Sequence, residues 1–151
     1  MKIVIASDHA GVSYKAILFK EIQDKGFDIT DLGTRNQDIP DDYPDYAEKI
    51  AHAIINKEAE RGIIICGSGV GVSVAANKFK GIRAGVCHDT YSAHQCVEHD
   101  NANVLCIGER VIGIELAREI VFAFLNATFS NEERHVRRLR KIDEIENENM
   151  K

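Results

Sequence analysis

The sequence lacks the features that mark secreted, membrane and nucleic-acid-binding proteins. Its apolar start, residues 1–5, passes directly into Ser7, Asp8 and His9, so it is too short for a signal peptide or a membrane span. The net charge of −5 argues against nucleic acid or an acidic membrane surface as a partner. We therefore expect neither a membrane nor a nucleic-acid partner.

Cysteines are few and show no paired motif. The four cysteines, at positions 66, 87, 96 and 106, form no CxxC pair and mostly lie in apolar runs. Such usage is typical of reduced thiols in a cytosolic protein and not of a disulfide framework. We therefore predict a cytoplasmic location.

Two nucleotide-binding motifs are missing from the glycine-rich stretch at residues 62–73. A dinucleotide-binding fingerprint requires glycine at position 72, where this chain has Val72. The Gly-Lys-Ser/Thr run of a P-loop is also missing. The stretch is therefore suited to binding an anion, without specifying a nucleotide.

The same stretch contains an apolar, β-branched run that breaks at Cys66 into three alternating glycines. This pattern predicts a buried strand, a tight turn and a following helix that reaches about residue 78. Free N–H groups at the start of that helix favour a bound anion or oxyanion. Cys66 has two interpretations, a reactive thiolate near a helix N-terminus or a small buried apolar side chain.

Strands alternate with helices along the chain, and 151 residues are typical of a single domain spanning 1–151. Apolar runs predict strands at 2–7, 27–32, 62–66, 82–87 and 104–107. Helical spacing predicts helices at 12–25, 47–55, 90–99 and 116–125, and a polar loop at 33–45 holds both prolines. We predict an α/β three-layer sandwich with a five-stranded, mainly parallel, Rossmann-like sheet.

Polar residues follow several predicted strands, and the carboxyl ends of parallel strands meet at one edge of a sheet. The expected group is Asp8, His9, Cys66, Gly67, Ser68, His88, Asp89, Gly108, Glu109 and Arg110. A thiolate base, oxyanion donors and a cation suit proton abstraction next to a carbonyl of a phosphorylated substrate. Tyr43 either covers this site or packs on its own loop.

The tail, residues 131–151, has only a thin apolar stripe. Its members are Val136, Leu139, Ile142 and Ile145. A helix of this kind gains stability by packing on another subunit. Arg134, His135 and Arg138 share one face at helical spacing, which suits either a phosphate clamp or an ordinary solvated surface.

A zinc site is the rival interpretation of the polar residues. His94, Cys96 and His99 lie close together, with Cys87 and His88 nearby. However, His94 and His99 are five residues apart and fall on different faces of a helix. The spacing does not match common zinc ligand patterns, so we expect no metal.

The motifs together resemble the ribose-5-phosphate isomerase B family, whose wider membership includes galactose-6-phosphate isomerase subunits. The motifs are Ser7-Asp8-His9-Ala10-Gly11, Asp42-Tyr43-Pro44, Cys66-Gly67-Ser68-Gly69-Val70-Gly71, Ala75-Ala76-Asn77-Lys78, Gly81-Ile82-Arg83-Ala84, Asn103-Val104-Leu105 and Gly108-Glu109-Arg110. They run in order over about residues 2–145. The resemblance implies interconversion of ribose 5-phosphate and ribulose 5-phosphate through an enediolate in the pentose phosphate pathway. It also implies no metal or organic cofactor, and a homodimer or dimer of dimers with shared sites.

The resemblance further implies roles for individual residues. Cys66 matches the base, His99 the residue that opens the sugar ring, and Ser68 a proton relay. Asp8, His9 and Tyr43 match residues that contact the substrate. We also expect Asp8 to be one of the catalytic residues. N–H groups of Gly67, Ser68, Gly69, Val70 and Gly71 would stabilise the enediolate. The phosphate set is Arg110, Arg134, His135 and Arg138, and Asp100 stands where many relatives have asparagine.

Three alternatives to a ribose 5-phosphate isomerase remain open. The first is an isomerase of a six-carbon sugar phosphate, such as galactose 6-phosphate or allose 6-phosphate. The second is a phosphosugar-binding protein without chemistry, although such a protein would need none of Cys66, Ser68 and His99. The third is a zinc hydrolase.

Overall fold

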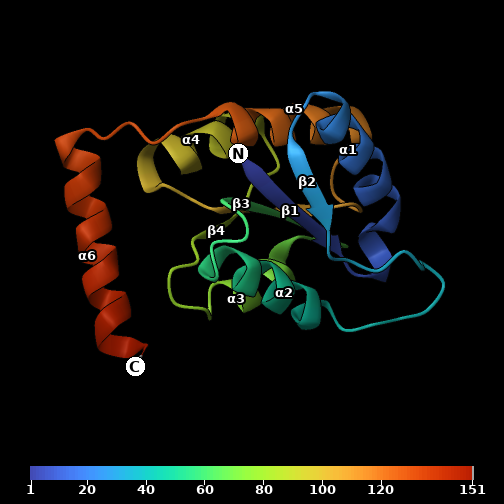
Figure 1. The fold of residues 1–151 in the computed structure, drawn as a ribbon, viewed down its shortest axis with the longest axis horizontal. Coiled ribbons are helices and arrows are strands. Elements are labelled where there is room, and N and C mark those ends of the chain that lie inside the picture. The colour runs from blue at the N-terminus through green and yellow to red at the C-terminus, as the bar shows by residue number, and fades with distance from the viewer. Residues whose placement is uncertain (151) are drawn as a thin grey trace.

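The computed structural model describes residues 1–150 and contains one five-stranded sheet between two layers of helices (Figure 1). The strands are β1 (Lys2–Ser7), β2 (Asp28–Asp31), β3 (Arg61–Cys66), β4 (Ala84–Val86) and β5 (Val104–Gly108). The helices are the short 3-10 helix η1 (His9–Gly11), α1 (Val12–Asp24), α2 (Tyr43–Ile55), α3 (Val70–Ala76), α4 (Thr90–Asp100), α5 (Ile114–Asn126) and α6 (Glu133–Asn149). The predicted α/β sandwich is confirmed.

The sheet has the order β2-β1-β3-β5-β4, and every strand pair in it is parallel. Its side chains alternate between two apolar layers. Ile63 and Ile65 pack with residues of α1, α4 and α5, whereas Ile64 and Cys66 pack with residues of α2 and α3. Figure 1 shows the two groups of helices on opposite sides of the sheet. Burial of both faces explains why β3 reads as an unbroken apolar run.

Helix α2 and strand β4 are among the elements whose extent differs from the predicted one. Helix α2 already begins at Tyr43, because Pro44 sits in its first turn, where the missing N–H of proline costs nothing. Strand β4 covers only Ala84–Val86 of the predicted 82–87. The N–H of Arg83 donates to the side-chain oxygen of Asn103 at 2.8 Å instead of joining the ladder.

Helix α6 stands apart from the sandwich and contacts it at few points (Figure 1). The Gly81 N–H donates to Glu146 Oε1 at 2.8 Å, and Arg83 lies 3.8 Å from Asp143. Of the predicted apolar stripe, Val136, Ile142 and Ile145 are exposed and Leu139 is half-buried. The predicted helix is confirmed, and its packing on a second subunit stays a prediction.

The order of the strands determines where a ligand binds. From β1 the chain crosses to β2 on one side and later to β3 on the other, so the connections diverge between β1 and β3. Ligands of open α/β sheets bind outside the carboxyl ends of strands at such a point. Within residues 1–150, no helix combines the length and the apolar character needed to cross a membrane.

Candidate active site

A cavity of about 430 Å³ opens where β1 and β3 end side by side. Its lining residues are Asp8, His9, Ala10, Tyr43, Cys66, Gly67, Ser68, Gly71, Arg110 and Val111. They come from η1 and its N-cap, the start of α2, the end of β3 and the loop after it, the start of α3, and the loop after β5. The structure therefore brings together most of the group that the strand ends predicted.

Cys66 is the last residue of β3 and is nearly buried, with 5% of its surface exposed at the cavity. Its Sγ accepts the backbone N–H of Gly69 at 3.0 Å. Gly69 has a φ of +79°, a backbone conformation that is strained for residues with a side chain. This turn directs the Gly69 N–H back at the sulfur. The hydrogen bond holds the Gly69 N–H against the sulfur, which also lines the cavity. All four cysteines are free thiols, as the sequence predicted.

Two glycines of the loop make room for neighbouring side chains. A Cβ on Gly67 would lie 3.3 Å from the Arg110 guanidinium, which therefore covers the turn closely. A Cβ on Gly71 would lie 2.7 Å from the Tyr43 ring. Tyr43 thus packs against the start of α3 and forms one wall of the cavity. This agrees with the interpretation that Tyr43 covers the site.

Ser68 lies between these glycines and is exposed at the cavity. Its Oγ accepts the N–H of Val70 at 3.2 Å. A hydroxyl that accepts one hydrogen bond keeps its own proton for donation. Ser68 can therefore donate a proton into the cavity while its oxygen stays tied to the loop.

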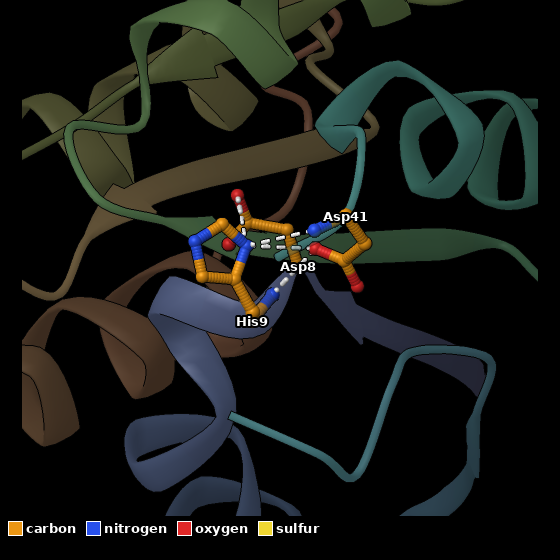
Figure 2. A group of neighbouring side chains, drawn as sticks. All are labelled: Asp8, His9 and Asp41. Carbon is orange, nitrogen blue, oxygen red and sulfur yellow. Dashed lines mark hydrogen bonds and ion pairs between the residues drawn. The ribbon is translucent and has the colours of Figure 1, made fainter. Parts of the chain in front are cut away.

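Asp8, His9 and Asp41 lie together at one end of the cavity, where His9 is hydrogen-bonded to Asp41 (Figure 2). Asp8 is 5% exposed and accepts the N–H of Ala10 at 2.9 Å. Burial raises the pKa of Asp8 above its usual range, against the lowering effect of the Ala10 hydrogen bond. His9 Nδ1 lies 2.8 Å from Asp41 Oδ1 and 4.0 Å from Asp8 Oδ2.

Asp41 was not among the residues predicted for the site. It lies in the polar segment before α2, where no periodicity or strand end indicates a role. One ligand atom each from Asp8, His9 and Asp41 lies within 4.8 Å of the others. This trio could hold a divalent cation only after loss of the proton shared between His9 and Asp41.

A second group of predicted site residues lies away from this cavity. The His99 ring on α4 stacks on the His135 ring of α6, with centroids 4.1 Å apart. Burial, together with the charge on His99, lowers the pKa of His135, so the neutral ring is favoured there. His135 is buried against His99, whereas Arg134 and Arg138 of the same helix are exposed.

Several predicted residues do not line the Cys66 cavity in this chain. They are Gly69, Val70, His99, Asp100, Arg134, His135 and Arg138. Gly69 lies buried behind the sulfur, and Val70 is exposed. Arg134 pairs with Glu132 at 2.9 Å. Among the residues that line the cavity, Arg110 is the only lysine or arginine.

The residues of the rival zinc site engage different partners. His94 faces Glu98 at 3.2 Å, and His99 contacts Gln95 at 3.0 Å and His135. The Cys96 Sγ lies 3.9 Å from that of Cys87. Within the described residues, these side chains do not form a group of converging metal ligands. The zinc interpretation therefore receives no geometric support.

Comparison with known proteins agrees with the motifs. The family described as Ribose/Galactose Isomerase matches residues 3–142. Ribose-5-phosphate isomerase B of Clostridium thermocellum is 45% identical with a TM-score of 0.94, covering 98% of this chain and 99% of that chain. The Mycoplasma genitalium ribose-5-phosphate isomerase B structure with bound ribulose-5-phosphate is 42% identical with a TM-score of 0.92, covering 98% and 97%.

One relative carries a different substrate in its name. D-erythrulose-4-phosphate isomerase 2 of Mycolicibacterium smegmatis is 45% identical over 131 residues, covering 85% of this chain and 86% of that protein. Relatives of nearly equal similarity therefore differ in the length of the sugar in their names. The agreement of motifs, fold and family match over almost the whole chain shows that the chain belongs to the Ribose/Galactose Isomerase family.

Proposed function

We propose that this chain interconverts ribose 5-phosphate and ribulose 5-phosphate, with Cys66 as the base. Membership of the family makes it an aldose–ketose isomerase. The proposal adds the identity of the substrate, a five-carbon sugar phosphate. One observation carries the assignment of the base. The Cys66 sulfur faces the cavity at the end of β3 and accepts the Gly69 N–H at 3.0 Å.

The chemistry of the proposed reaction follows from the groups around the cavity. The Cys66 thiolate takes the proton from C2 of the open-chain aldose, which leaves an enediolate, and returns it to C1. Ser68 donates its hydroxyl proton to O1 of the enediolate and takes the proton from O2, so it relays a proton between the two oxygens and ends as a hydroxyl. Arg110 covers the loop at Gly67 and supplies positive charge beside the developing anion.

We propose that a second copy of the chain completes each site. The cavity has a single arginine, although a phosphate is normally held by several donors. Arg134 and Arg138 are exposed on α6, which also exposes the apolar stripe of Val136, Ile142 and Ile145. Docking of this helix on a partner would bury the stripe and bring the two arginines and the His99 region to the partner's cavity.

An enzyme that prefers a sugar of another length is the second candidate. The name of the relative from Mycolicibacterium smegmatis, D-erythrulose-4-phosphate isomerase 2, makes a four-carbon sugar phosphate the rival substrate for this chain. The experiment is turnover of ribose 5-phosphate, erythrulose 4-phosphate, allose 6-phosphate and galactose 6-phosphate by one preparation, with and without chelator. The highest kcat/KM for the pentose, unchanged by chelator, is the expected result, and a higher value for another sugar would replace the substrate.

Shared sites are tested by combining two inactive chains. Cys66→Ala and His99→Asn chains are co-expressed with different tags, and the mixed dimer is purified through both tags. If each site takes Cys66 from one chain and His99 from the other, one site per mixed dimer is intact and roughly half the wild-type turnover returns. Inactivity of the mixed dimer, with activity in the doubly tagged wild type, would contradict shared sites.

A further inference from the structure

The Asp41 carboxylate makes three hydrogen bonds at the edge of the cavity, and two of them hold His9. The backbone N–H of His9 donates to Asp41 Oδ1 at 2.9 Å, and His9 Nδ1 lies 2.8 Å from the same oxygen. The other carboxylate oxygen, Oδ2, accepts the Tyr46 hydroxyl of α2 at 2.6 Å. Asp41 therefore ties the 3-10 helix η1 to α2 through one carboxylate, and Figure 2 shows the His9 side of this link.

The protonation of this group follows from its contacts. Burial acts to raise the pKa of Asp41, but the hydrogen bonds from Tyr46 and His9 outweigh it and leave the pKa below its usual value. The carboxylate is therefore ionised at neutral pH. Against an ionised oxygen at 2.8 Å, His9 Nδ1 must carry a proton, because two lone pairs would otherwise repel. The Asp41 N–H, 3.3 Å from Nδ1, is the weaker contact.

We propose that Asp41 is a positioning residue that acts through His9: it holds the proton on Nδ1 and so presents Nε2 to the sugar phosphate. This inference rests on the proposed isomerase function, because it assigns His9 a substrate contact. Asp41 itself does not line the cavity, whereas His9 does. Figure 2 shows the second ring nitrogen on the side of the imidazole opposite to Asp41.

Without Asp41 the ring would have no strong partner for Nδ1. The Asp8 carboxylate is the nearest substitute at 4.0 Å, which is beyond hydrogen-bond distance. His9 is about a third exposed, so its ring would be free to rotate and to exchange its proton between the two nitrogens. Loss of Asp41 thus disorders the nitrogen that meets substrate, while Cys66 and its loop stay in place.

The first arm of the test measures the tautomer of His9 directly and does not depend on activity. Two-bond proton–nitrogen NMR spectra of ¹⁵N-labelled protein are recorded for wild type, Asp41→Ala and Asp41→Asn, with His9→Asn to assign the His9 signals. We expect a proton on Nδ1 in wild type and in Asp41→Asn, whose amide oxygen still accepts it, and loss of that preference in Asp41→Ala. A wild-type proton on Nε2 would overturn the proposal.

The second arm is a double-mutant cycle on kcat/KM. Asp41→Ala should cost about tenfold in the wild-type background, mainly in KM, because a hydrogen bond to a charged group is lost. In the His9→Ala background the same change should cost less than about twofold, because Asp41 then has no ring to position. Equal losses in both backgrounds, or no loss in the first, would overturn the proposal.

Control variants separate this role from stability and from charge. Asp38→Ala removes an exposed carboxylate from the same loop and should leave KM and the His9 spectrum unchanged. Asp41→Asn should recover most of the kcat/KM lost in Asp41→Ala, which a purely ionic role would not allow. If wild type isomerises no sugar phosphate, the proposed function fails, and the NMR arm still decides whether Asp41 holds His9.

Discussion

The close approach of β5 to the Cys66 loop makes Gly108→Ala a sharp perturbation of the site. A Cβ on Gly108 would lie 2.6 Å from the carbonyl carbon of Ser68, whereas ordinary contacts begin at 3.4 Å. The neighbours are backbone atoms, so the loop must move by roughly 0.8 Å rather than rotate a side chain away. This shift acts on the segment whose Gly69 N–H donates to Cys66 at 3.0 Å.

The expected loss in Gly108→Ala is larger for activity than for folding. Overpacking of a tight contact costs about 1–3 kcal/mol of unfolding free energy. Misplacement of reacting groups by about 1 Å can cost on the order of 10²-fold in rate. Steady-state turnover and urea unfolding measure the two effects on the same preparation.

Gly113→Ala is the matched control for this change. A Cβ at Gly113, the residue before α5, meets no atom within 4 Å, so the same substitution there should leave kcat/KM near wild type. A Gly108→Ala protein with kcat/KM within about twofold of wild type would refute the reasoning. It would show that the loop after β3 accommodates the methyl group without disturbing the site.

Three further predictions concern buried charges and thiols. Lys15, which is 2% exposed, lies 2.6 Å from Asp31, so Lys15→Ala should cost about 3–5 kcal/mol in urea unfolding by removing the buried partner of that carboxylate. Because burial raises the pKa of Asp8, wild type loses folding free energy as the pH rises through that pKa and the carboxylate ionises. The free energy of unfolding of Asp8→Asn, minus that of wild type, should therefore be larger at neutral pH than below pH 3.8. Burial also raises the pKa of Cys106, so iodoacetamide should label Cys66 before Cys106 in mass spectrometry, and ribose 5-phosphate should protect Cys66.

Contrary results for these three are equally specific. Near-wild-type stability of Lys15→Ala would mean that the Asp31 carboxylate finds water or another donor. A stability difference for Asp8→Asn that does not change with pH would remove the linkage to its titration. Labelling of Cys106 in folded protein at the rate of Cys66 would contradict the burial of that thiol.

The sheet and one half of the site were predictable because their signals are local. Strands buried on both faces leave apolar runs, and parallel strands bring their carboxyl ends to one edge. Those two rules alone place Cys66 and Ser68 beside Asp8 and His9. The alternating glycines likewise predicted a tight turn after Cys66, and the structure has it with a positive φ at Gly69.

The remaining features depend on contacts that no local pattern records. Asp41 reaches His9 across 32 residues from a loop without periodicity. Spacing placed His135 on one face with Arg134 and Arg138, yet stacking on His99 turns its ring inward. Pro44 reads as a loop residue and instead starts α2, because a helix tolerates proline in its first turn.

The central claim is that Cys66 moves a proton between C2 and C1 of ribose 5-phosphate. Its most direct test is isomerisation in deuterium oxide, followed by NMR of the product, for wild type and Cys66→Ser. We predict turnover with deuterium at C1 of the product in wild type, because the S–H formed on Cys66 exchanges with solvent before the proton is delivered. We also predict a loss of at least about 10²-fold in Cys66→Ser with substrate binding retained. Wild-type turnover by Cys66→Ser would contradict the assignment of the base.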